Sequence, residues 1–271
     1  MVTVMEFLEG FTLLDHDLLG TDIVNNTVAI ELGKFMGKTH AATHSSKLAK
    51  DKVEEFAKLF ENRAMRDIQL EFVFTKCYNE ATDDQKNGLI VDEAFMKEIE
   101  ELKAAYNGAN IDNLSLCHGD LHPGSVMVNK DEVRVIDPEF TVYGPPGLDV
   151  GSLLSGYVLA AVHQAYSGNK DAVSSIIKDV ENIWYSYKNE MENGGISSEL
   201  LKKIEIETIG FTVAEVCRTA LEFAGGRKWL QFDDTDVKLE ARKAALSIVS
   251  SCMSGRHKGG MALLLSEISK L

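Results

Sequence analysis

The four prolines of this 271-residue chain all lie in one short window, at Pro123, Pro138, Pro145 and Pro146. Proline interrupts a helix because it lacks a backbone donor and its ring clashes with the preceding turn. A chain that avoids proline elsewhere is free to form long helices, whereas the window that holds the prolines is expected to form rigid loops. The sequence therefore predicts a mainly helical body with one loop-rich segment near its middle.

The composition excludes several classes of protein. A net charge of −14 argues against nucleic-acid binding, because phosphate contacts need clustered lysine and arginine. No apolar run reaches the roughly 18 residues of a membrane span, and the first ten residues carry no basic residue of a secretory signal. The cysteines are scattered and read as reduced thiols of a cytoplasmic protein: Cys77, Cys117, Cys217 and Cys252.

The spacing of apolar residues predicts helices over most of the chain. From Asn26, a plausible N-cap, apolar residues recur every three or four positions. The same spacing predicts helices over about 49–61, 66–79, 91–107, from 149 onward, and over about 170–192, 197–224, 235–253 and 258–270. Residues 6–20 read as acidic and irregular.

Short apolar runs predict a small β insert around the proline window. The runs at 114–117, 126–128 and 133–136 read as strands, and the last two form a hairpin across the turn at 129–132. A further run, Val2–Met5, reads as a strand at the start of the chain. The predicted fold class is α+β, mainly α, with a small central β-hairpin.

Acidic side chains follow these predicted strands where the loops begin. Asp120 follows the first strand, and Asp137 and Glu139 follow the third. A loop carboxylate can accept the proton of an attacking hydroxyl, and hard oxygen ligands suit Mg²⁺. This is the order of the catalytic and metal loops in protein-kinase-like enzymes, with Ser125 in place of the usual asparagine and Glu139 in place of the usual glycine.

Three strings carry a resemblance to a known family: HGDLHPGS at 118–125, VIDPEF at 135–140 and YGPPGLDVG at 143–151. They closely resemble the motifs HGDLHTGS, VIDPEF and YGPxGxDxG of the methylthioribose kinases, which are protein-kinase-like small-molecule kinases related to aminoglycoside and choline kinases. The resemblance is dense over 118–151 and weaker over the rest of the chain.

The resemblance implies a domain organisation. Residues 11–271 would form the C-terminal lobe of a kinase, and residues 1–10 would be the last strand of the N-terminal lobe and the hinge. No G-x-G-x-x-G loop after a strand and no strand lysine is found in the chain. We therefore expect the remainder of the N-terminal lobe to be absent.

The same resemblance implies a reaction. Asp120 would be the base for the C1 hydroxyl of 5-methylthioribose, which would receive the γ-phosphate of ATP in methionine salvage. Asp137 and Glu139 would bind Mg²⁺. The partners would be a sugar and ATP, with no nucleic acid and no membrane, and the family is often dimeric, which makes a homodimer possible.

The resemblance also implies supporting contacts. The backbone near Glu6 and Leu8 would meet the adenine. From its position in the sequence, Ser125 would either lie beside a metal-bound water or only begin the hairpin. His118 would pack and hydrogen-bond within the catalytic loop, and Asp149 would accept hydrogen bonds from the backbone of that loop.

The resemblance identifies the acceptor less firmly than the rest of the reaction. The family carries two adjacent arginines at the substrate, whereas here Arg218 follows Cys217 and stands alone. By the resemblance Arg218 would bind the substrate, and a helix-surface ion pair to Glu215 or Glu222 is the alternative. Another sugar or an amino-alcohol acceptor stays open, as does a truncated or degenerate lobe that binds a partner without catalysis.

Two histidines have a spacing that suits a metal site. His40 and His44 are four residues apart on one predicted helix face, but the sequence offers no third ligand. Their position near a helix C-terminus, which favours positive charge, is the preferred interpretation.

Overall fold

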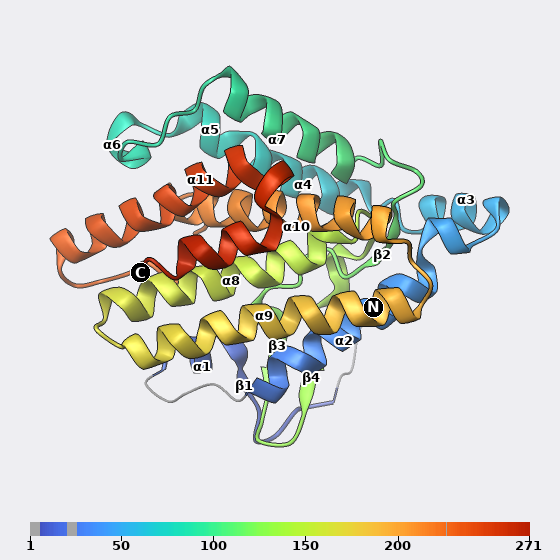
Figure 1. Ribbon diagram of the computed structural model, residues 1–271, viewed down its shortest axis with the longest axis horizontal. Helices are drawn as coiled ribbons and strands as arrows, with labels where there is room; N and C mark the ends of the chain where they lie inside the picture. Colours follow the sequence, from blue (N-terminus) through green and yellow to red (C-terminus); the bar gives the residue numbers. More distant parts are fainter. Residues whose placement is uncertain (1–5, 21–25, 226) are drawn as a thin grey trace.

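The computed structural model describes residues 6–20, 26–225 and 227–271, so the predicted strand Val2–Met5 lies outside the described residues. Helices make up most of the molecule (Figure 1). Their bounds are α1 Leu14–Leu19, α2 Asn26–Thr43, α3 Lys50–Leu59, α4 Arg63–Phe74, α5 Lys76–Glu80, α6 Asp83–Lys86, α7 Glu93–Tyr106, α8 Gly147–Tyr166, α9 Lys170–Asn193, α10 Ser198–Ala220 and α11 Thr235–Ile268.

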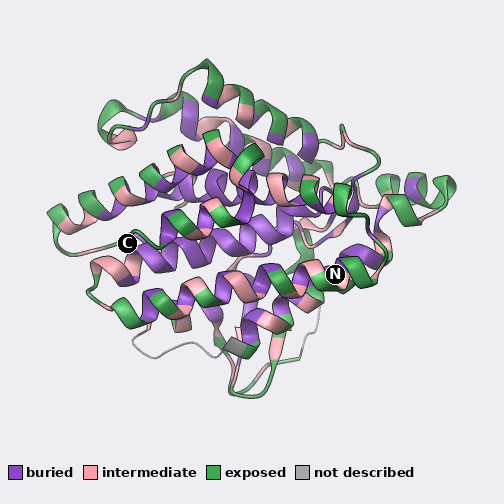
Figure 2. Cartoon of the chain, in the orientation of Figure 1, coloured by how far each residue is buried: buried purple, intermediate pink, exposed green. Residues whose placement is uncertain are grey.

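Helix α8 forms the centre of the core. Its side chains are apolar on nearly every face, which is the composition expected of a fully buried helix. Helices α9 and α10 pack against it, α2 packs on α9, and α11 packs on α10. Figure 2 shows the buried residues concentrated along α8 and the adjoining helices. No helix among the described residues is both long and apolar enough to cross a membrane.

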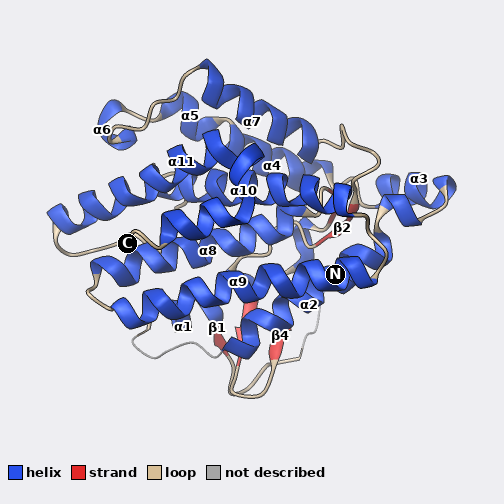
Figure 3. Cartoon of the chain, in the orientation of Figure 1, coloured by secondary structure: helices blue, strands red, loops and turns tan. Residues whose placement is uncertain are grey.

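Two small antiparallel sheets lie beside these helices (Figure 3). One has the order β1 (Thr12–Leu13), β3 (Val126–Val128), β4 (Val133–Val135), with Val126 opposite Val135. The other pairs β2 (Ser115–Cys117) with β5 (Val142–Gly144). The predicted hairpin is therefore confirmed as β3–β4.

The prediction that residues 6–20 are irregular is wrong over its second half. Thr12 and Leu13 pair with β3, and α1 follows immediately with Leu14 and Leu18 buried. A two-residue strand gains its order from a partner more than a hundred residues away, so local spacing cannot reveal it. Strand β5 was not predicted either, because its three residues are too few to show a strand pattern and it pairs with β2 across the intervening loops.

The structure divides one predicted helix and joins two others. The helix expected over 66–79 is divided into α4 and α5 at Thr75, which has non-helical backbone angles. Residues expected to separate the last two helices are instead helical, and α11 is interrupted only at Gly260, where φ is +50°. Glu205 accepts a hydrogen bond from the freed N–H of Met261 at 2.9 Å, which satisfies the backbone at this break.

One acidic side chain lies inside the core without a partner. Asp179 of α9 is 0% exposed, and neither carboxyl oxygen has a hydrogen-bond partner among the described residues. Burial, followed by the charge of Asp179, raises the pKa of the buried Tyr157 of α8. The Tyr157 hydroxyl also has no hydrogen-bond partner among the described residues. Burial raises the pKa of Asp179 to about 7.

Asp179 is expected to make stability fall as pH rises. The folded chain disfavours the charged carboxylate, whereas the unfolded chain ionises near the ordinary value of 3.8, so stability is lost between these pKa values. Between pH 5 and 8 the wild type should lose about 2–3 kcal/mol more than Asp179→Asn, from ~1.4 kcal/mol per pKa unit. Urea unfolding across this range measures the difference. Asp171→Asn, an exposed change on the same helix, should parallel the wild type, and a parallel curve for Asp179→Asn would contradict the prediction.

Candidate active site

Two loops that carry the predicted site residues pack directly on each other. The catalytic loop (118–125) follows β2, and the metal loop (136–141) follows β4. They meet at Gly119, where φ is +89° and a Cβ would overlap the carbonyl oxygen of Phe140. Gln69 donates a hydrogen bond of 2.6 Å to the Gly119 carbonyl from the other side. Only glycine permits this approach, which fixes the spacing between the loops.

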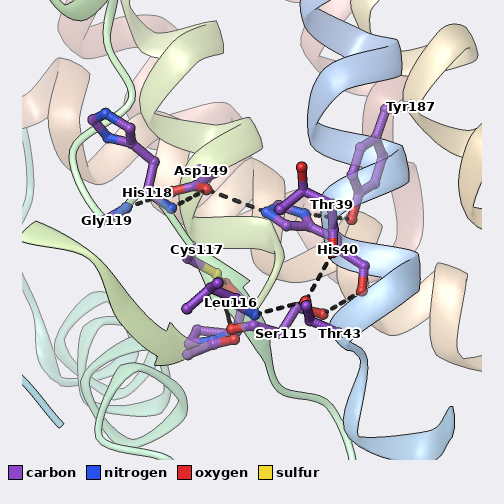
Figure 4. A network of polar contacts seen from close by, with 12 residues as sticks. Thr39, His40, Thr43, Ser115, Leu116, Cys117, His118, Gly119, Asp149 and Tyr187 are labelled. Atoms are coloured by element: carbon purple, nitrogen blue, oxygen red, sulfur yellow. Dashed lines mark hydrogen bonds and ion pairs between the residues drawn. The ribbon is translucent and has the colours of Figure 1, made fainter. Parts of the chain in front are cut away.

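Asp149, in the first turn of α8, ties the catalytic loop to the core (Figure 4). Its carboxylate accepts the backbone N–H of His118 at 2.7 Å and of Gly119 at 2.8 Å. Nε2 of His40, in α2, lies 3.2 Å from Oδ2 of Asp149. Nδ1 of His40 lies 3.3 Å from the Tyr187 hydroxyl. Burial alone would raise the pKa of Asp149, but hydrogen bonding to His40 and the nearby positive charges lower it overall.

The interpretation of His40 from its position in the sequence is incomplete. His40 is buried on the same face of α2 as Leu32 and Met36, and it is held by Asp149 rather than by a helix terminus. His44 has separate partners, accepting from the Ser46 N–H at 3.2 Å. The two histidines therefore do not act as a pair. The sequence signal that could have identified His40 is a polar residue at a position of an amphipathic helix that faces the core.

Asp120 lies in the catalytic loop with its carboxylate partly exposed. Its backbone N–H donates to Nδ1 of His118 at 3.3 Å, and its carbonyl accepts the Ser125 hydroxyl at 2.9 Å. The Ser125 backbone carbonyl accepts a hydrogen bond from the N–H of Ile136 at 2.9 Å, which joins this loop to the start of the metal loop. The Ser125 hydroxyl thus shapes the backbone around Asp120.

The electrostatic surroundings of Asp120 suit proton transfer. Burial, followed by the negative charge of Glu215, raises the pKa of Asp120 to about 6, while Arg227 and Arg218 oppose the rise. A carboxylate with this pKa is ionised at neutral pH yet still basic enough to take a proton.

The metal loop presents two free carboxylates. Asp137 has left-handed backbone angles (φ +64°, ψ +58°), and strain of this kind is commonly found at functional sites, at a cost of about 1–3 kcal/mol. Among the described residues, the carboxylates of Asp137 and Glu139 form no hydrogen bond or ion pair. Hard, unpaired oxygen donors two residues apart fit Mg²⁺, which needs only one or two protein carboxylates.

A pair of arginines shares one buried carboxylate close to Asp120. Arg218 of α10 and Arg227 of the following connection lie 2.6 and 3.2 Å from the same oxygen of Glu215. Burial would raise the pKa of Glu215, but these two charges lower it to about 2. Arg218 thus forms the ion pair with Glu215 that the sequence allowed. The sequence does not mark Arg227, because the segment after α10 brings it to this site only by folding back.

The residues expected at the adenine, Glu6 and Leu8, lie in the loop before β1, where Glu6 is exposed and Leu8 is partly exposed. Among the described residues, no hydrogen bond links their side chains to either loop.

Comparison with known proteins identifies the family of the chain. A model of the phosphotransferase enzyme family matches residues 2–174. Methylthioribose kinase of Exiguobacterium sibiricum is 26% identical over 94% of this chain and 69% of its own length, and that of Bacillus velezensis is 28% identical over 95% and 68%. A solved glucosamine kinase is 12% identical, with a TM-score of 0.49 over 89% of this chain and 60% of its own. Since the family model covers more than half of the chain and both loops, the chain belongs to the phosphotransferase enzyme family.

Proposed function

We propose that this protein is a kinase that transfers the γ-phosphoryl group of ATP to the C1 hydroxyl of 5-methylthioribose, a step of methionine salvage. The main support for this proposal is the position of Asp120. Its carboxylate is basic and accessible, and its loop packs against the loop of Asp137 and Glu139. The names of the relatives that align over most of the chain support the choice of acceptor.

The residues of the site would have separate roles in this reaction. Asp120 orients the acceptor hydroxyl and takes its proton as the new P–O bond forms and the bond from the γ-phosphorus to the leaving ADP breaks. Asp137 and Glu139 would hold Mg²⁺, which when bound neutralises charge on the phosphates. Arg218 and Arg227 add positive charge near Asp120. His118 and Asp149 hold the loop backbone in place.

The test is the identity of the phosphorylated product. The chain is incubated with MgATP and 5-methylthioribose, ribose or choline, and ³¹P NMR identifies the product over long incubations. We expect a C1 phosphate of 5-methylthioribose that disappears with EDTA. Phosphorylation of choline alone would contradict the proposed acceptor, and a folded chain that phosphorylates none of them would contradict the kinase.

A further inference from the structure

His122, two residues beyond Asp120, is held in one orientation. Its Nδ1 accepts the backbone N–H of Gly124 at 3.0 Å and so caps the short 3₁₀ turn Pro123–Ser125. A neutral imidazole that accepts at Nδ1 carries its proton on Nε2. That Nε2 lies 3.7 Å from Oδ2 of Asp120.

The surrounding packing keeps the ring in this place. A Cβ at Gly124 would lie 2.7 Å from Cε1 and 2.9 Å from Nδ1 of His122, so the imidazole occupies the space that a side chain there would fill. Asp15 of α1 reaches the same spot, with one oxygen 3.6 Å from that Cβ position. The other oxygen of Asp15 is buried without a hydrogen-bond partner among the described residues.

Burial and the neighbouring arginines keep His122 neutral. Burial, followed by the charge of Arg227, lowers its pKa to about 4. The charged groups that face His122 are Arg227, Glu215, Asp15 and Arg218, and those that face Asp120 are Glu215, Arg227, Arg218 and His118. At neutral pH the imidazole is therefore an uncharged donor beside an ionised carboxylate.

We propose that His122 is a positioning residue that donates its Nε2–H to Oδ2 of Asp120 when the acceptor binds, leaving Oδ1 to receive the acceptor proton. This inference rests on the proposed role of Asp120. A distance of 3.7 Å is compatible with it, because catalytic hydrogen bonds are often long in a free enzyme and tighten in the complex. Occupying one oxygen fixes the carboxylate rotamer and directs the proton to the other.

Two substitutions separate this role from that of a loop cap. His122→Asn keeps an acceptor near Nδ1 for the Gly124 N–H but removes the donor, whereas His122→Gln places an amide donor near Nε2 and loses the cap. We expect His122→Asn to lower kcat by about 10- to 100-fold with little change in KM, in line with the loss of one part of a base's 10²–10⁴-fold contribution. His122→Gln should stay within a few-fold of wild type. Equal losses in both variants, or a loss in His122→Gln alone, would overturn the inference.

A second readout does not need turnover. The pKa of the Asp120 carboxyl is followed by ¹³C NMR with aspartate labelling in the complex with saturating 5-methylthioribose and without ATP, using Asp120→Asn to assign the signal. Loss of a donor to the charged form raises a carboxyl pKa, so His122→Asn should raise that of Asp120 while His122→Gln leaves it unchanged. An unchanged pKa in His122→Asn would overturn the inference about His122. Full activity in Asp120→Asn would instead overturn the proposed function.

Discussion

Replacing Asp120 by asparagine is expected to lower kcat for phosphoryl transfer by about 10²–10⁴-fold, the contribution of a well-placed general base. The amide has nearly the shape of the carboxylate but cannot take a proton. The hydrogen bonds that shape the loop here use the Asp120 backbone, so the fold should be retained. Initial rates with saturating substrates, together with the free energy of unfolding of the same preparation, measure both outcomes.

The pH profile gives the same prediction an independent form. Because Asp120 acts in its ionised state and its pKa is raised to about 6, kcat/KM should fall as pH drops through this value. Asp131→Asn, at an exposed turn between β3 and β4, is the matched control and should leave both rate and profile unchanged. An Asp120→Asn variant with wild-type kcat would remove Asp120 from the role of base.

Replacing Asp149 by asparagine is expected to destabilise the fold by about 3–5 kcal/mol, the usual cost of breaking a buried charged pair from one side. The carboxylate accepts two backbone N–H groups and faces His40, all away from water. An amide exchanges one acceptor for a donor, so at least one buried N–H of the catalytic loop loses its partner. Urea unfolding at pH 7 measures the loss.

Two further variants show whether the network is the cause. Asp149→Asn combined with His40→Ala should cost less than the sum of the single changes, by about 0.5–3 kcal/mol, because the two residues interact directly. Glu93→Gln, another acidic residue in a first helical turn but exposed, should change stability by less than about 1 kcal/mol. The lowered pKa of Asp149 also means that its contribution is present at neutral pH and is lost on acidification. A cost below 1 kcal/mol for Asp149→Asn would refute this account.

The sequence predicts best what local spacing determines. Helices α9 and α10 begin and end close to the expected residues, and the β3–β4 hairpin forms around its own short turn. The order of the candidate site could also be predicted, since Asp120, Asp137 and Asp149 each follow or begin a regular element.

The rest depends on contacts between distant segments. His40 and Asp149 are 109 residues apart, and their contact exists only because α2 and α8 enclose the same polar spot. Arg227 joins Arg218 only when the segment after α10 folds back over Glu215. No periodicity within a single segment contains this information.

The attachment of the catalytic loop to α8 affects how the protein can move. Loops usually open more easily than the core beneath them. Here the amides of His118 and Gly119 are bonded to a carboxylate in the most buried helix of the molecule, so they can be released only when that helix is disturbed. The active-site backbone thus belongs to the same cooperative unit as the core. A destabilising substitution deep in α8 would therefore disturb the position of Asp120 even if the loop did not open locally.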